Sequence, residues 1–363
     1  NTTASYNVAV GLESLKVNTT GQRNTGLGSF SFLSNTTGNY NTGLGYEALA
    51  SNTSGASNVA VGYQALDLNT TASNNTAVGY QAGYTANSGN GVQALGFQAM
   101  YSNTTGDGTA VGYRALYSNT TGTQNTALGY QAGDAITTGS YNVAVGANAA
   151  GSTTTGTQNI AVGQAALLSN TGGSFNVAVG DNALTLSTAS NNVAIGYQAG
   201  TSNTTGTLNS FFGSYAGYSN TTPNNNSFIG SFAGYSNTTG AANTALGQAA
   251  LQNNTTASSN TAVGYQAGYN NTTGQYSAFL GHQAGYFTTG GTNTFVGQQA
   301  GQQITTGAGN TIIGRFNGNQ GGLDIRTSSN YIVLSDGDGN PRFYFDGANS
   351  FHPGVQYLDG NSA

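Results

Sequence analysis

The block Asn75-Thr-Ala-Val-Gly-Tyr-Gln-Ala-Gly83 recurs almost unchanged at Asn125–Gly133 and again at Asn260–Gly268. Its fifth residue is a glycine that follows an apolar residue, and this pair can be traced through 19 copies, 17 residues apart except for three steps of 16. A short, fixed period over so many copies is the signature of a solenoid. The anchor glycines are Gly11, Gly28, Gly45, Gly62, Gly79, Gly96, Gly112, Gly129, Gly146, Gly163, Gly180, Gly196, Gly213, Gly230, Gly247, Gly264, Gly281, Gly297 and Gly314.

Positions are counted from 1 to 17 as they fall in the first copy. Position 10 is apolar in every copy and position 8 is mostly Thr or Val, which is the alternating, β-branched pattern of a strand. The glycine at position 11 ends that strand, where we expect a positive φ or a close backbone approach. Position 14 is Ala or Ser in all copies but the last, which predicts a second short strand that faces a tight space.

The period also decides the fold class. Seventeen residues are too few for a helix, a strand and their turns, and no apolar stripe of helical period runs through them. Two short strands and two turns do fit, and successive coils would stack at the spacing of neighbouring strands, about 4.8 Å. The sequence therefore predicts an all-β chain whose residues 1–318 form a parallel β-solenoid, or β-roll, of about 19 coils.

Two further positions carry predictions about contacts between coils and between chains. Position 7 is Asn in 16 of the 19 copies, which predicts either a ladder of hydrogen bonds along the solenoid or an Asx turn at each strand. Position 9 is small or aromatic and faces away from positions 8 and 10, so we expect 8 and 10 to fill the coil and 9 to face a partner chain. The ladder residues are Asn58, Asn75, Asn125, Asn142, Asn159 and Asn176. The interface residues are Ala144, Ala161, Phe211, Phe228, Phe279 and Phe295.

The composition limits the classes of partner. Net charge is −5, only 5% of residues are charged, and the six Lys and Arg form no cluster, which disfavours nucleic acid. No apolar run reaches the length of a membrane span, so membrane insertion is not expected. The tyrosines recur at two fixed places in the repeat, after the anchor glycine and in the next turn. We expect these rings to stack in ladders, with sugar binding as the alternative role.

After about Gly318 the repeat stops, and residues 319–363 are predicted to form a small C-terminal β cap. Residues 331–334 and 343–345 read as strands on either side of Asp336-Gly-Asp-Gly-Asn340, which is a hairpin-turn composition. A Ca²⁺ site is the alternative, but the glutamate that ends an EF-hand loop is missing. We expect no metal and no cofactor.

The blocks Asn-Val-Ala-Val-Gly and Asn-Val-Ala-Ile-Gly, at Asn58–Gly62, Asn142–Gly146, Asn176–Gly180 and Asn192–Gly196, resemble the head repeat of trimeric autotransporter adhesins. The repeat with its Asn-Thr-Thr-Gly corner also looks like that of bacteriophage tail fibres, and Asn330–Arg342 is similar to the segment before their self-cleaving chaperone. These resemblances imply a left-handed coil and a homotrimer. They also imply a processed C-terminus at Ala363.

The function expected from the sequence is a structural and adhesive extracellular fibre on a virion or cell surface, such as a tail-fibre or adhesin shaft that presents a surface to a host glycan or receptor. A self-assembling filament is the nearest alternative, and an ice-binding solenoid is less well supported because the paired threonines lie at turns. Catalysis is not expected. The acidic residues of the repeats look isolated, and neither His282 nor His352 has an acid near it in its own coil.

Overall fold

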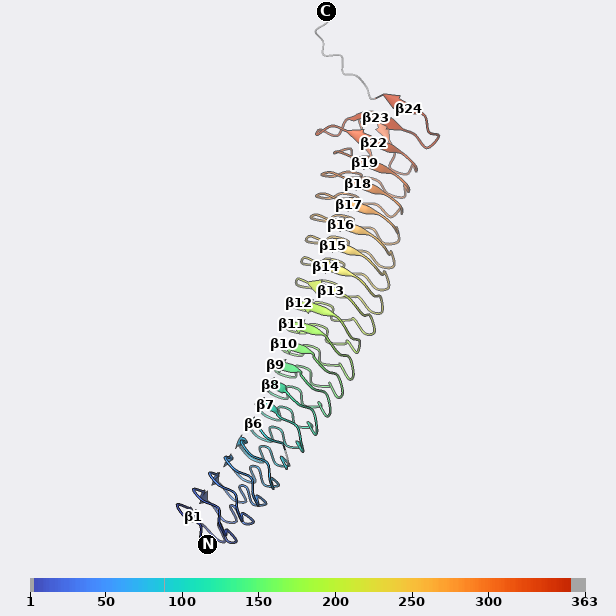
Figure 1. The fold of residues 1–363 in the computed structure, drawn as a ribbon. Coiled ribbons are helices and arrows are strands. Elements are labelled where there is room, and N and C mark those ends of the chain that lie inside the picture. Colours follow the sequence, from blue (N-terminus) through green and yellow to red (C-terminus); the bar gives the residue numbers. More distant parts are fainter. Residues whose placement is uncertain (1–2, 88, 354–363) are drawn as a thin grey trace, which may run out of the picture. The chain divides into compact units, whose positions relative to one another are not determined.

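The computed structural model describes residues 3–87 and 89–353 of the chain. It divides into two compact units, residues 1–190 and residues 191–363. Each unit is a stack of coils with one short strand per coil, and the arrows in Figure 1 follow one another in sequence order within each unit. The described residues contain no helix. The predicted fold class, an all-β parallel β-solenoid, is confirmed.

Unit 1 contains the strands β1 to β11, and unit 2 contains β12 to β24. The strands of unit 1 are β1 (Val8–Val10), β2 (Thr25–Leu27), β3 (Thr42–Leu44), β4 (Val59–Val61), β5 (Thr76–Val78), β6 (Val92–Leu95), β7 (Gly108–Val111), β8 (Asn125–Leu128), β9 (Val143–Val145), β10 (Ile160–Val162) and β11 (Val177–Val179). The repeat strands of unit 2 are β12 (Val193–Ile195), β13 (Ser210–Phe212), β14 (Ser227–Ile229), β15 (Thr244–Leu246), β16 (Thr261–Val263), β17 (Ala278–Leu280), β18 (Thr294–Val296) and β19 (Thr311–Ile313).

Neighbouring strands pair in parallel, and the register equals the repeat length. Ile160 lies opposite Val177, 17 residues on, whereas Gln93 lies opposite Thr109 because that coil is one residue shorter. The anchor glycine makes this close stacking possible. Gly62 has φ of +138°, and a Cβ built on it would lie 2.7 Å from the carbonyl carbon of Gly79 in the next coil. Any other side chain would force the two coils apart there.

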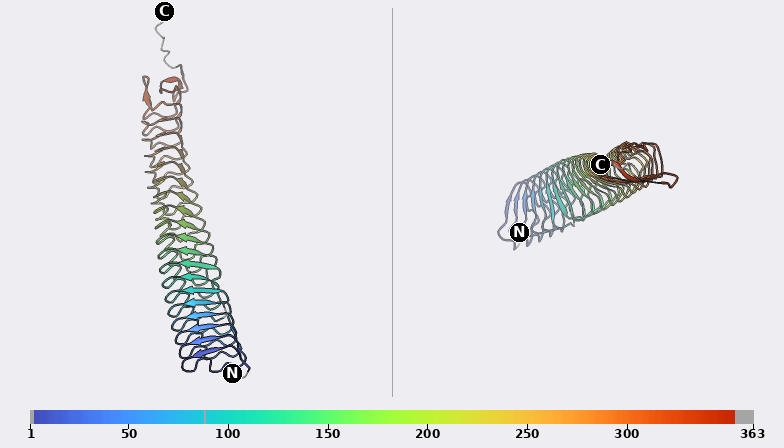
Figure 2. Two further views of the ribbon diagram at one scale, coloured as in Figure 1. Left: turned by 90° about the vertical axis from the view of Figure 1, so that its left-hand side faces the viewer. Right: turned by 90° about the horizontal axis from the view of Figure 1, so that it is seen from above.

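The coil has one strand, not the two that the sequence predicts. The segment after the anchor glycine is a series of turns, drawn as loops beside the strand row in Figure 2. Gln64 and Leu66 in this segment have positive φ, 54° and 51°, so the backbone cannot extend as a strand. It still bonds from coil to coil, since Gln64 N–H donates to Tyr46 O (2.9 Å). The small residue at position 14 is buried, as predicted.

The C-terminal part of unit 2 ends the parallel stack with an antiparallel sheet. Strand β22 (Ile332–Ser335) pairs in parallel with β19, and β23 (Pro341–Phe345) and β24 (Phe351–Pro353) then follow in antiparallel pairing. A short hairpin, β20 (Asn319–Gln320) and β21 (Leu323–Asp324), lies in the connection from β19 to β22. The predicted hairpin and small β cap are therefore present, and the predicted C-terminus at Ala363 lies outside the described residues.

Candidate assembly face and side-chain ladders

The asparagines at position 7 lie inside the coil and join neighbouring coils. The backbone N–H of Asn159 donates to Oδ1 of Asn142 (3.0 Å), and the N–H of Asn176 donates to Oδ1 of Asn159 (3.0 Å). The side-chain amide of Asn159 also donates to the carbonyl of Gly173 in the following coil (2.9 Å). Each side chain therefore pairs backbone groups that the buried turn would leave unsatisfied. The same backbone-to-side-chain bond joins Asn58 with Asn75 and Asn125 with Asn142.

A second asparagine ladder lies at position 1, the first residue of the Asn-Thr-Thr-Gly corner. Nδ2 of Asn52 donates to Oδ1 of Asn35 (2.8 Å), and Nδ2 of Asn69 donates to Oδ1 of Asn52 (3.1 Å). These side chains are fully buried. The ladder is interrupted after Asn69, whose Oδ1 has no hydrogen-bond partner in the described structure, and the next coil carries Ala86, which has no side-chain donor. The recurrence of Asn at position 1 is a signal that sequence reasoning could have used.

The prediction that position 9 lies at an interface between chains is wrong. All six predicted interface side chains are fully buried inside the single chain: Ala144, Ala161, Phe211, Phe228, Phe279 and Phe295. They face the interior because position 9 packs against position 15 of the same coil. Where position 9 is phenylalanine, position 15 is glycine; a Cβ on Gly301 would lie 2.6 Å from the ring of Phe295. Where position 9 is alanine, position 15 can be a buried leucine, as with Ala161 and Leu167.

Positions 8 and 10 therefore form the outward face of the strand row, which we call the assembly face. No residue at these two positions of β1–β19 is charged. Position 10 presents exposed apolar side chains in both units, and in unit 2 the apolar surface continues onto the cap. The exposed members include Leu27, Leu44, Val78, Leu95 and Leu128 in unit 1, and Ile195, Phe212, Ile229, Leu246, Leu280, Val296, Ile313, Ile332, Phe343, Phe345 and Phe351 in unit 2. An uncharged apolar row of this kind, present in each unit, is a candidate contact surface.

The aromatic side chains stack along the coils, as predicted. At position 12 of unit 1 a ladder of six rings runs through Tyr46, Tyr63, Tyr80, Phe97, Tyr113 and Tyr130, with neighbouring centroids 5.1 to 5.4 Å apart. A second ladder at position 16 joins Tyr84, Tyr101 and Tyr117, and the guanidinium of Arg114 lies 4.0 Å from the ring centre of Tyr117. Inside a ladder both faces of a ring are covered by its two neighbours, so only the ring edges meet solvent, whereas an end ring has one stacked neighbour.

Two acidic side chains that look isolated in the sequence are neighbours in the structure. Burial raises the pKa of the Asp67 carboxyl to about 6, and the negative charge of Glu47 adds to this effect. Glu47 accepts a hydrogen bond from the side-chain amide of Gln64 (2.7 Å). The pair is too small to hold a metal: among the residues that the structure describes, no group of three or more His, Cys, Asp or Glu side chains could do so.

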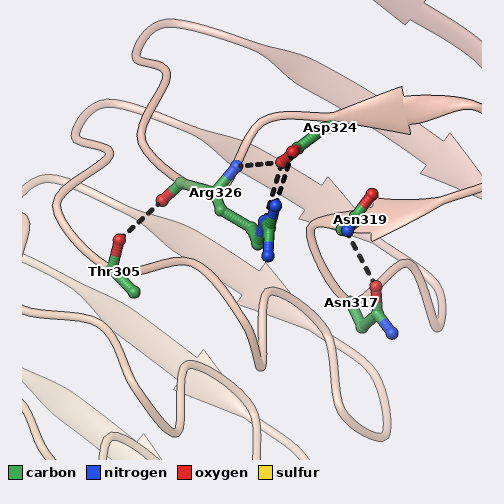
Figure 3. Close-up of polar contacts among 5 residues, drawn as sticks. All are labelled: Thr305, Asn317, Asn319, Asp324 and Arg326. Carbon is green, nitrogen blue, oxygen red and sulfur yellow. Dashed lines mark hydrogen bonds and ion pairs between the residues drawn. The ribbon is translucent and has the colours of Figure 1, made fainter.

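The cap is held by short-range polar contacts. Figure 3 shows the guanidinium of Arg326 on both carboxylate oxygens of Asp324 (3.0 and 2.8 Å), the carbonyl of Arg326 accepting from Thr305, and the N–H of Asn319 donating to Oδ1 of Asn317. The ion pair is exposed and lowers the pKa of Asp324. These contacts fasten the β20–β21 connection to the last coils.

Both carboxylate oxygens of Asp336 have partners within the β22–β23 hairpin. Its Oδ1 accepts from the N–H groups of Asp338 (3.0 Å) and Asn340 (2.9 Å), and its Oδ2 pairs with Arg342 (2.6 Å). The bond from Asn340 is the main cause of its lowered pKa. These contacts are those of the predicted hairpin turn, and they use the carboxylate oxygens that a Ca²⁺ loop would need as ligands. The expectation that His352 has no acid nearby is wrong, because its Nε2 lies 3.0 Å from Oδ2 of Asp346.

In comparisons with protein-family models, curated proteins and solved structures, none matched this chain. The part of the chain that the structure describes has no helix with the length and apolar character of a membrane span.

Proposed function

We propose that this chain is the shaft subunit of an extracellular structural and adhesive fibre, of the tail-fibre or surface-adhesin kind, and that three copies assemble side by side through the assembly face. The observation that carries the proposal is the uncharged, apolar outward row at position 10. Removing the apolar surface of such a row from water in a contact between chains stabilises the assembly by about 25 cal/mol per Å² buried. A monomer that exposed it would be prone to association.

The partner that fits this face best is another copy of the same chain. Side chains on the face recur at the coil spacing, about 4.8 Å, and only a partner with the same spacing can pack against each of them in turn. Three copies around an axis close the assembly without leaving one apolar face open. A face without charge also has no repulsion to overcome when identical chains meet.

The two alternatives receive less support. A filament made by end-to-end stacking needs a free parallel edge at each end, whereas β22 turns the stack into the antiparallel pair β23 and β24. An ice-binding face needs a regular array of one side chain, whereas position 10 changes between Val, Leu, Ile and Phe along the row. Varied sizes suit protein packing better than a crystal lattice.

The mass of the assembly tests the proposal. Leu128 and Leu246 are exposed members of the assembly face, one in each unit, and the double variant Leu128→Asp, Leu246→Asp places charges where copies would meet. We expect native mass spectrometry to show trimers for the natural chain and monomers for the variant, with an unchanged β spectrum by circular dichroism. The control is Thr121→Asp at an exposed corner, which should remain trimeric. An assembly of unchanged mass in the double variant would refute the assembly face.

A further inference from the structure

The six-ring ladder of unit 1 has one end that is not covered. The ring at its start, Tyr46, has Phe30 packed against it edge-on, with centroids 5.6 Å apart. At the other end, Tyr130 stacks on Tyr113 with one face (5.2 Å), but the next coil carries Ala147 at this position. Within the described residues no ring packs on the second face of Tyr130. Its exposed fraction, 53%, exceeds the 40 to 43% of the four rings before it, Tyr63, Tyr80, Phe97 and Tyr113.

The space beside this open ring face has the thickness of one further ring. Ala147 leaves one step of the ladder empty, and the next side chain at position 12, in the coil after it, is the exposed Gln164. Two coil steps span about 10 Å. A planar guest held between two walls at van der Waals contact needs about 7 to 8 Å. A six-membered ring therefore fits on Tyr130 with the methyl group of Ala147 beneath it.

The polar groups around the open face are amides and not cations. The backbone N–H of Asn148 donates to the carbonyl of Tyr130 (2.9 Å), which fixes Asn148 beside the ring. The side-chain amides of Asn148 and Gln164 have no hydrogen-bond partner in the described part of the chain, so both are available to a ligand. Gln131 lies at the same level, with its amide on the carboxylate of Asp134 (3.3 Å). Two carboxylates lie near this end of the ladder, Asp134 and Asp181, whose Oδ1 accepts from the backbone N–H of Gln164 (2.9 Å). One guanidinium, that of Arg114, acts on Asp134, so the net charge here is negative.

We infer that the open face of Tyr130, with Ala147, Asn148 and Gln164, is a binding site for the pyranose ring of a neutral sugar. A pyranose has an apolar C–H face, which packs on an aromatic ring, and a rim of hydroxyls that both donate to and accept from amides. The half-buried Asp134 disfavours acidic sugars. The inference deepens the proposed adhesive function and rests on it only for the biological source of the sugar.

Saturation-transfer NMR on the full chain tests the site, with methyl β-D-glucopyranoside and methyl β-D-galactopyranoside as neutral probes and methyl β-D-glucuronide as the acidic one. We expect saturation of the ring C–H protons of a neutral probe, with an affinity in the millimolar range, and at least tenfold weaker binding of the acidic probe. Ala147→Tyr should abolish binding, because tyrosine at this position extends the ladder as it does in the coils before it. No binding to the natural chain, or equal binding to Ala147→Tyr, would overturn the inference.

A second variant keeps the test decisive if Ala147→Tyr folds poorly. Tyr80→Ala opens a gap in the middle of the ladder and exposes the faces of Tyr63 and Phe97, so the number of bound sugars per chain should rise from one to two. An unchanged number would count against ring stacking as the basis of binding. Native mass spectrometry on the same samples distinguishes failure of the sugar site from failure of the proposed trimer. The site lies on one chain, so a variant that loses sugar binding should keep the mass of the trimer.

Discussion

The packing of position 9 against position 15 predicts that a paired exchange should be tolerated where each single change is not. In the coil of β14, Phe228 is fully buried and Gly234 faces its ring. A Cβ on Gly234 would lie 2.5 Å from Cδ2 and 2.6 Å from Cζ of that ring. The next coil has the opposite arrangement, Ala245 with a buried Leu251. The two coils therefore fill the same interior space in two ways, with a large residue either at position 9 or at position 15.

The magnitudes follow from this geometry. Phe228→Ala leaves a cavity and should cost about 3 to 5 kcal/mol of unfolding free energy. Gly234→Leu overpacks the coil and should cost about 1 to 3 kcal/mol or more. The backbone itself accepts leucine, since φ is 58° at Gly234 and 49° at Leu251. The double variant recreates the pair of the next coil, so it should lose only the contact between Phe228 and Phe211, about 0.5 to 1.5 kcal/mol.

Denaturant unfolding of the four proteins, followed by circular dichroism, gives the coupling energy of this double-mutant cycle. We expect the two changes to compensate by at least about 2.5 kcal/mol. The pair Ala161→Gly and Gly234→Leu, which lie in different coils, serves as the control and should be additive. Additive costs for Phe228→Ala and Gly234→Leu would show that positions 9 and 15 do not share one space.

Two further predictions concern buried polar groups. Ala86→Asn should restore the position-1 ladder at Asn69 and raise the unfolding free energy by about 1 kcal/mol in thermal or denaturant unfolding, and a loss of stability would contradict the ladder geometry. Because the pKa of Asp67 is raised from 3.8 to about 6, the folded chain binds this proton more tightly than the unfolded chain. Stability should therefore rise as pH falls from about 6 to about 4, by at most about 3 kcal/mol, and Asp67→Asn should remove this rise. The lowered pKa values of Asp336 and Asp346 act in the opposite direction, below about pH 4.

The fold could be predicted from the sequence because each coil repeats one backbone path. The spacing of the anchor glycines sets the strand register directly, so Ile160 pairs with Val177 at 17 residues and Gln93 with Thr109 at 16. The number of strands per coil could not be predicted in the same way. Positive φ at residues such as Gln64 and Leu66 turns the second segment away from an extended path, and neither residue type favours that conformation by itself.

The orientation of the strand could not be read from its alternation alone. A period of two separates one face from the other, but it does not say which face is inside. The β-branched and large apolar residues at positions 8 and 10 suggest a core, yet the coil is too narrow to hold two such rows. What identifies the inner face is a correlation across the coil: phenylalanine at position 9 occurs with glycine at position 15, as in Phe295 with Gly301.

The same correlation explains why the outward face is apolar. In most coils the interior holds the residues of positions 9, 14 and 15, together with one or two asparagines that satisfy the turns. So thin a core buries little apolar surface for each residue that it orders. Stability must then come from the ladders between coils and from contacts outside the coil. In the assembly that we propose, the apolar row at position 10 is that second source, so the proposal predicts that packing of chains adds to the stability of the fold.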